Sequence, residues 1–186
     1  MAVVYLNTET LEEQSAVLRA GDRVFLSGTV YTARDAAHKR LFDLLDADAP
    51  LPFPIAGSVI YYAGPTPPRG GMPTGSCGPT TSGRMDTFTP RLIALGLKAT
   101  IGKGARSRPV VDAMKRHGAV YLCAVGGAGA LMATCITAME EMAFPELGCE
   151  SLKRLRVENM PLYTAIDTAG RSLYEEGPAA YRAASL

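Results

Sequence analysis

Blocks of hydrophobic and polar residues alternate along this chain, and each change of period marks a predicted element. Short apolar or β-branched runs predict strands over residues 3–6, 23–31, 58–63, 100–101, 119–125, 152–157 and 162–167. Helical spacing of apolar residues predicts helices over 8–21, 32–45, 85–95, 107–118 and 132–139. Pro90 is expected to break or kink the third of these helices. Strands and helices mix throughout, which indicates an α/β fold without fixing the order of the strands.

Composition favours a single domain over residues 1–186, because 47% of the residues are hydrophobic and no charge run or Ser/Gly-rich linker divides the chain. A Gly- and Pro-dense segment over 64–75 predicts a long irregular loop within it. The formal net charge of +1 argues against a broad surface for nucleic acid or acidic lipid. The first residues do not read as a signal peptide and no apolar run is long enough to span a bilayer, so a cytoplasmic protein is expected.

The four cysteines are far apart in the sequence, with no C-x-x-C pair and no histidine at ligand spacing. No metal site is therefore expected within this chain. Cys123, Cys135 and Cys149 are expected to pack as small buried hydrophobic residues. Cys77 stands apart because it directly precedes the turn that begins the segment discussed next.

The segment 78–86 is a candidate carboxylate site, where a loop turns into a predicted helix. It carries the adjacent hydroxyls of Thr80 and Thr81, and the guanidinium of Arg84 can grip a carboxylate with two parallel hydrogen bonds. Unpaired N–H groups at a helix N-terminus favour an anion as well. The alternative interpretation is a helix cap made by a Thr or Ser side chain, with an ordinary surface arginine.

Two further cations lie at predicted element ends. Arg34 falls in the first turn of a helix, where the dipole disfavours a cation unless an anion is bound there; the alternative is an exposed arginine paired with Asp35. Lys103 lies between two glycines after an apolar strand. A small substrate with two carboxylates would use Arg34, Arg84 and Lys103 together. His38 is either an acid–base group or a structural residue, and the structural role is favoured.

Nucleotide binding is poorly supported by the glycine-rich turns. Lys103 lacks the glycine spacing and the following Ser or Thr of a P-loop, and the turn 126–129 lacks the full dinucleotide pattern. Tight packing of a strand against a helix explains those glycines better.

Several segments, in order along nearly the whole chain, together resemble the C-terminal domain or β subunit of iron–sulfur class I fumarases and L-tartrate dehydratases. They are TARDAAHK (32–39), GPTTSGRMD (78–86), KGARS (103–107) and PELGCE (145–150). The resemblance implies a three-layer β/β/α swivelling domain and a hydro-lyase that reversibly hydrates fumarate to (S)-malate. An α subunit would complete it, in a heterodimer or heterotetramer, and would carry three cysteines binding a 4Fe-4S cluster.

The resemblance also implies residue roles. Arg34, Arg84 and Lys103 would bind the carboxylates of the dicarboxylate substrate, with Thr81 beside them, and Thr80 would handle the proton lost from carbon with help from a partner carboxylate. The alternatives are an L-tartrate dehydratase β subunit and a non-catalytic dicarboxylate-binding module. The segment 103–107 and the Gly126–Gly127 turn look more like fumarases.

Overall fold

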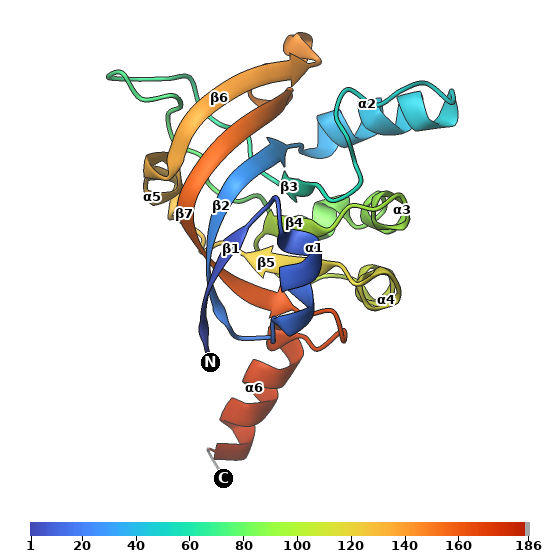
Figure 1. Cartoon of the computed structure of the whole chain (residues 1–186), viewed down its shortest axis with the longest axis vertical. Coiled ribbons are helices and arrows are strands. Elements are labelled where there is room, and N and C mark those ends of the chain that lie inside the picture. The colour runs from blue at the N-terminus through green and yellow to red at the C-terminus, as the bar shows by residue number, and fades with distance from the viewer. Residues whose placement is uncertain (185–186) are drawn as a thin grey trace.

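A computed structural model describes residues 1–184 as a mixed α/β fold (Figure 1). The strands are β1 (Val3–Asn7), β2 (Arg23–Thr32), β3 (Val59–Tyr61), β4 (Ala99–Gly102), β5 (Val120–Cys123), β6 (Ile136–Ala143) and β7 (Leu152–Ile166). The α-helices are α1 (Leu11–Gln14), α2 (Asp35–Asp46), α3 (Thr89–Ala94), α4 (Arg108–His117), α5 (Gly129–Thr134) and α6 (Leu173–Ala184). Short 3-10 helices are η1 (Ser15–Val17), η2 (Ser82–Met85) and η3 (Pro145–Glu150). Among these residues, no helix combines the length and apolar composition needed to span a bilayer.

The strands close into a ring. β1 to β5 pair in chain order and in parallel, and β7 then runs antiparallel to both β5 and β2. The ring therefore consists of β2, β3, β4, β5 and β7, while β1 and β6 extend it at β2 and β7. Figure 1 shows α2, α3 and α4 on one side of these strands and α5 on the other.

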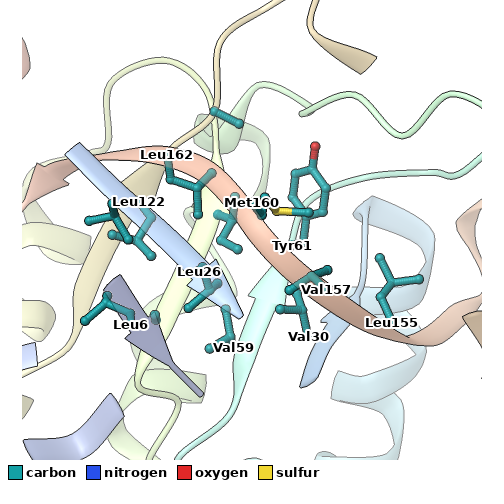
Figure 2. Packing of buried hydrophobic residues seen from close by; sticks show 14 of the residues in the cluster. Leu6, Leu26, Val30, Val59, Tyr61, Leu122, Leu155, Val157, Met160 and Leu162 are labelled. Carbon is teal, nitrogen blue, oxygen red and sulfur yellow. The ribbon is translucent and has the colours of Figure 1, made fainter. Parts of the chain in front are cut away.

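The main hydrophobic core fills the inside of this curved sheet, where side chains from β2, β3, β5 and β7 meet (Figure 2). Along β7, Leu155 and Val157 are buried whereas Arg154 and Arg156 are exposed, as the two-residue period of a strand requires. Two further clusters pack the outer side of the sheet, one under α2 and one under α4. Burial on both sides fixes β3, β4 and β5, whose ends carry the site described below.

The predicted helix over 132–139 is wrong. α5 ends at Thr134, and the following residues form β6, which pairs antiparallel with the first half of β7. The residues of β6 include Ala, Met and Glu, which favour helices, but the hydrogen bonds offered by β7 outweigh that preference.

Other predictions need smaller corrections. The strands predicted over 152–157 and 162–167 are one continuous β7, which passes a bulge where Asn159 adopts a φ of 49°. The helical run predicted over 85–95 is interrupted near Pro90, as expected: residues 86–88 form a turn, and α3 begins at Thr89 with Pro90 in its first turn, where proline is tolerated. The helix predicted over 8–21 is reduced to α1 and η1, and Thr8 instead accepts a hydrogen bond from the Thr29 N–H at 2.8 Å. α6 was not predicted.

Candidate active site

The carboxyl ends of the parallel strands β2, β3, β4 and β5 lie in register, an arrangement that brings the segments following them to one edge of the sheet. The aligned residues are Thr32, Tyr61, Ile101 and Leu122. Arg34 follows β2 and Lys103 follows β4 directly. In α/β folds with parallel strands, closed barrels as well as open sheets, ligands bind at such strand ends, so this edge is the candidate site.

Thr80 and Thr81 are held at this edge by backbone hydrogen bonds. The Thr80 N–H donates to the Tyr62 carbonyl at 2.6 Å, and the Lys103 N–H donates to the Thr80 carbonyl at 3.2 Å. Thr81 forms an isolated parallel bridge with Lys103, and the Ser82 N–H donates to the Lys103 carbonyl at 2.8 Å. The two threonines therefore lie between the chain leaving β3 and the chain leaving β4, with Thr80 half-buried and Thr81 exposed.

Close packing beneath the threonines depends on glycine at position 102. A Cβ there would lie 2.0 Å from the Ser82 Oγ, so a side chain would push the segment 80–82 away from β4. The Ser82 hydroxyl is fixed in turn by the Tyr121 hydroxyl at 2.9 Å, which also bonds the Gly104 carbonyl. Buried hydrogen bonds thus fix the position of the segment with the two threonines relative to the end of β4.

Lys103 and the glycine turn after β5 are neighbours. A Cβ on Gly126 would lie 3.7 Å from Lys103 Cδ and 4.0 Å from its Nζ, so the half-buried lysine side chain runs along this turn. Gly129 lies against the Gly78 backbone, where a Cβ would come within 3.2 Å of the Gly78 nitrogen. Gly129 therefore serves close packing, but against the loop residues Ser76 and Gly78 and not between a strand and a helix as predicted, whereas a Cβ on Gly126 would make only ordinary contacts.

Arg84 extends from η2 to the start of α2. Its Nε donates to Asp35 Oδ1 at 2.9 Å and its Nη2 lies 2.7 Å from Asp35 Oδ2, while half of its side chain remains exposed. The helix predicted here is only a four-residue 3-10 helix, so the helix-dipole argument loses its weight and the side chains carry the case. Thr81, at the N-cap, makes no side-chain capping bond, so that alternative interpretation fails at this residue.

Arg34 lies at the N-cap of α2 in an extended conformation, not in the first helical turn as predicted. Its side chain is 22% exposed, and its Nη2 lies 3.1 Å from Glu150 Oε1, whereas Asp35 is 4.0 Å away. The alternative of an exposed arginine paired with Asp35 therefore holds only in part: the pair with Asp35 exists, but the arginine is mostly buried and its shorter ion pair is with Glu150. The Nε of Arg34 is the atom that faces Asp35; it is buried and makes no hydrogen bond among residues 1–184.

His38 contacts the backbone of Arg34 from inside the fold. Its ring is fully buried between Tyr62 and Phe88, and its Nδ1 lies 2.8 Å from the Arg34 carbonyl. Burial lowers the pKa of His38 to about 4, so the ring is neutral at pH 7 and Nδ1–H donates to the carbonyl. This geometry agrees with the structural role favoured above.

Arg106 is a residue of this region that sequence reasoning missed. Its side chain is fully buried between the rings of Tyr62 and Tyr121, and its Nε donates to Asp86 Oδ1 at 2.7 Å. The other Asp86 oxygen accepts the Ser107 N–H at 2.6 Å. Arg106 thus ties the 78–86 segment to the turn carrying Lys103. The only available signal was an arginine inside the KGARS segment.

Three further hydrogen bonds surround Arg106: Nη1 donates to Thr100 Oγ1 at 3.0 Å, and Nη2 donates to Thr89 Oγ1 at 2.8 Å and to the Tyr62 hydroxyl at 3.4 Å. Burial by itself lowers the pKa of the Arg106 guanidinium, but Tyr62 and Asp86 raise that pKa above its usual value. The group therefore stays charged, as a fixed strut within the fold.

The cysteines do not form a cluster. Cys77 is completely buried, and burial raises the pKa of its thiol to about 12, so it behaves as a small hydrophobic residue. Cys149 is exposed, which contradicts the expectation that it is buried, and Cys123 and Cys135 are half-buried. Within residues 1–184 no group of three or more His, Cys, Asp or Glu side chains could hold a metal ion.

These features define an α/β domain with a cationic site at the carboxyl ends of its parallel strands. The family model described as Fumarase C-terminus matches residues 1–177. The chain belongs to this family, as the four sequence segments indicated.

Curated relatives fall into two groups. The chain is 39% identical over 170 residues to fumarate hydratase 2 of Leishmania major and 40% identical over 156 residues to the anaerobic class I fumarate hydratase of Escherichia coli strain K12. These matches cover 90% and 83% of the chain but only 30% and 28% of the relatives, so the chain spans less than a third of their length. A putative L(+)-tartrate dehydratase subunit beta of Methanocaldococcus jannaschii is 39% identical over 165 residues, which cover 86% of the chain and 85% of that relative.

Proposed function

We propose that this chain is the β subunit of a two-chain hydro-lyase that reversibly hydrates fumarate to (S)-malate. The observation that carries the proposal is the joining of Arg34, Arg84, Lys103 and the two threonines in one network at the strand ends of a chain of this family. We further propose that residues 1–186 form one swivelling domain with a three-layer β/β/α arrangement.

The cations of the site suit a dianion. Arg84 is half-exposed, the Arg34 side chain is 22% exposed, and Lys103 is half-buried beside the Gly126 turn, so each retains some access to solvent. Charge-assisted hydrogen bonds from these groups would hold the two carboxylates and orient the carbon between them.

We assign to Thr80 the transfer of the proton that the substrate carbon loses. The Thr80 hydroxyl is carried by a backbone fixed on both sides, to Tyr62 and to Lys103, so the side chain has a defined place in the site. A threonine hydroxyl is a poor base alone. We propose that, in the dehydration direction, a carboxylate of the partner chain takes the proton of the Thr80 hydroxyl. Lys103 and the arginines stabilise the resulting alkoxide by their positive field, and the alkoxide then takes the proton from the substrate carbon.

The residues of this chain do not fit an iron–sulfur cluster. Its cysteines are dispersed, the most buried thiol has a raised pKa, and no suitable cluster of side chains exists among residues 1–184. We propose that a 4Fe-4S cluster belongs to a separate α subunit, in a heterodimer or heterotetramer. The name of the M. jannaschii relative, a subunit beta, supports a second chain.

The test is reconstitution. The chain and its α partner, purified separately and combined anaerobically with iron and sulfide, should hydrate fumarate, whereas this chain alone should not. Turnover of fumarate by the lone chain, or no turnover by the combined chains, would overturn the proposal. Faster conversion of tartrate than of fumarate and malate would assign the tartrate dehydratase function, which the M. jannaschii relative favours.

Calorimetry on the isolated chain distinguishes the proposed enzyme subunit from the alternative, a non-catalytic dicarboxylate-binding module. Half of a catalytic site should bind fumarate or malate weakly, because the groups that complete the site are missing. Tight dicarboxylate binding by the isolated chain would favour a binding module.

A further inference from the structure

The β6–β7 hairpin ends in a turn that reaches the start of α2. This turn is η3, and it contains the PELGCE segment, to which no role has been assigned above. Gly148 adopts a φ of 59° and a ψ of −118°, a conformation that favours glycine. The buried Lys153 ammonium holds the kink by donating to the Gly148 carbonyl at 2.8 Å. The hairpin tip is therefore a fixed structure.

Glu150 extends from this tip to two groups at the start of α2. One carboxylate oxygen, Oε1, lies 3.1 Å from Arg34 Nη2, and the other, Oε2, accepts the Ala36 N–H at 3.2 Å. The side chain at the N-cap of α2 makes no capping bond. Glu150, 114 residues away from Ala36 in the sequence, therefore caps this helix and grips the arginine with the same carboxylate.

Gly64 closes the other side of the Arg34 side chain. A Cβ at this glycine would lie 3.3 Å from Arg34 Nη1 and 3.1 Å from the Cys149 carbonyl oxygen. The guanidinium thus lies between the Gly64 backbone and the hairpin tip. A side chain at position 64 would crowd both the guanidinium and the tip. Its orientation is set by Glu150 and by this close packing.

Acidic and basic groups alternate across the site, in the order Glu150, Arg34, Asp35 and Arg84. Glu150 and Asp35 are 24% and 28% exposed, so this row is partly shielded from water. Shielded charge pairs orient their partners more firmly than exposed pairs do. The Nε of Arg34 is buried and faces Asp35, so a substrate carboxylate would meet the part of the Arg34 side chain that remains exposed.

We propose that Glu150 is a positioning residue, which holds the Arg34 guanidinium in the orientation that receives a substrate carboxylate. This inference rests on the proposed function and gives the PELGCE segment its role. Glu150 itself does not touch the substrate; it acts through Arg34.

The chain offers a matched control in Glu146. This residue lies on the same 3-10 helix and pairs with an arginine of α2, Arg40, at 2.7 Å. Both partners are about half exposed, and Arg40 does not belong to the site. Glu150→Gln and Glu146→Gln therefore remove the same charge from the same turn, and only the first change affects Arg34.

The experiment compares both variants in the reconstituted two-chain enzyme. Glu150→Gln should lower kcat/KM for malate by about 10- to 100-fold, mainly through a higher KM, because misplacing a binding group by a fraction of an ångström has effects of that order. Glu146→Gln should stay within about twofold of the wild type. In an Arg34→Gln background, Glu150→Gln should add almost nothing, because the residue through which it acts is gone.

Each contrary result has its own meaning. An unchanged KM in Glu150→Gln, or an equal further loss in the Arg34→Gln background, overturns the positioning role. A lower KM also overturns it, since Glu150 would then mask Arg34. Should Glu150→Gln fail to fold, Glu150→Asp replaces it, and a wild-type KM in that variant counts against the inference. Loss of the proposed function is distinguishable, because wild-type enzyme would then turn over neither fumarate, malate nor tartrate.

Discussion

Arg84 and Arg106 lie in two regions of the same site, and their surroundings are opposite. Arg106 is fully buried, sandwiched between two tyrosine rings, with hydrogen bonds to Asp86, Thr89 and Thr100. Arg84 is half exposed, and within residues 1–184 its side chain hydrogen-bonds and pairs with Asp35. A guanidinium whose donors are used inside the protein is a structural strut, whereas one that keeps donors in contact with solvent can exchange partners for a substrate.

The difference extends to the segments that these arginines hold. The 103–107 turn is fixed to the 78–86 segment by the buried Asp86–Arg106 pair, so Lys103 and Thr80 keep a constant spacing. The start of α2 is held by partly shielded ion pairs between Arg34, Asp35 and Glu150, and the row ends at the half-exposed Arg84. We therefore expect the side with the buried Arg106 to be the more rigid one, and the side that ends at Arg84 to be the more adjustable one.

Thr80 lies on the rigid side, and changing it should have the largest effect. Thr80→Ala in the reconstituted enzyme should lower kcat by about 10²- to 10⁴-fold, the range for loss of a proton-transfer group. Thr80→Ser keeps the hydroxyl and should recover most of the activity. Steady-state kinetics with malate measures both variants, and near wild-type turnover in Thr80→Ala would remove the catalytic assignment.

The same substitution in the two regions tests the comparison directly. Arg106→Gln should lower the free energy of unfolding by about 3–5 kcal/mol, because it leaves Asp86 without its buried partner. Arg84→Gln should cost less than about 1 kcal/mol, as expected for a half-exposed pair. Urea unfolding of the purified variants measures both values, and equal losses would mean that the two regions do not differ in rigidity.

Sequence patterns predicted the elements whose periodicity is strong and unopposed. α2, α4 and β5 appear close to their predicted places because their apolar residues fit a single buried face or a buried strand. β6 was mistaken for a helix because its own residues favour one, and only its pairing with β7, distant from the residues themselves, decides otherwise.

The residues of the site also divide into those that the sequence indicated and those that it did not. Arg34, Arg84 and Lys103 stood out in the sequence because charged residues at element ends form local patterns. Glu150 and Arg106 did not, because their roles arise from burial and from partners on other segments: Glu150 meets Ala36 across 114 residues. Residues that would contact a substrate left a local signature here, whereas residues that hold them in place did not.

Acidification should loosen the adjustable side. His38 is buried under Arg34, and burial lowers its pKa to about 4 from 6.5. The unfolded chain therefore binds a proton that the folded chain rejects between these pH values, and the stability that the neutral ring supplies above pH 6.5 is lost as pH falls toward 4. The loss should approach about 3 kcal/mol.

Urea unfolding at a series of pH values from 7.5 to about 4.5 measures this loss, with His38→Gln as the comparison. The variant should show a smaller loss over the same range because it lacks the buried imidazole whose pKa is lowered. An identical pH dependence in both proteins would show that His38 is not the group responsible.

The smallest effect should be found at Arg84 itself. Arg84→Lys keeps the positive charge but loses the planar fork that meets both oxygens of Asp35, so the side chain should still point toward the site without a fixed orientation. We expect the KM for malate to rise by roughly tenfold and the free energy of unfolding to change by less than about 0.5 kcal/mol. Arg108→Lys, on an arginine that is 78% exposed and pairs with Asp112 of the same helix, is the matched control and should change neither value. A large loss of stability in Arg84→Lys with an unchanged KM would reverse the comparison, since Arg84 would then be a structural strut like Arg106.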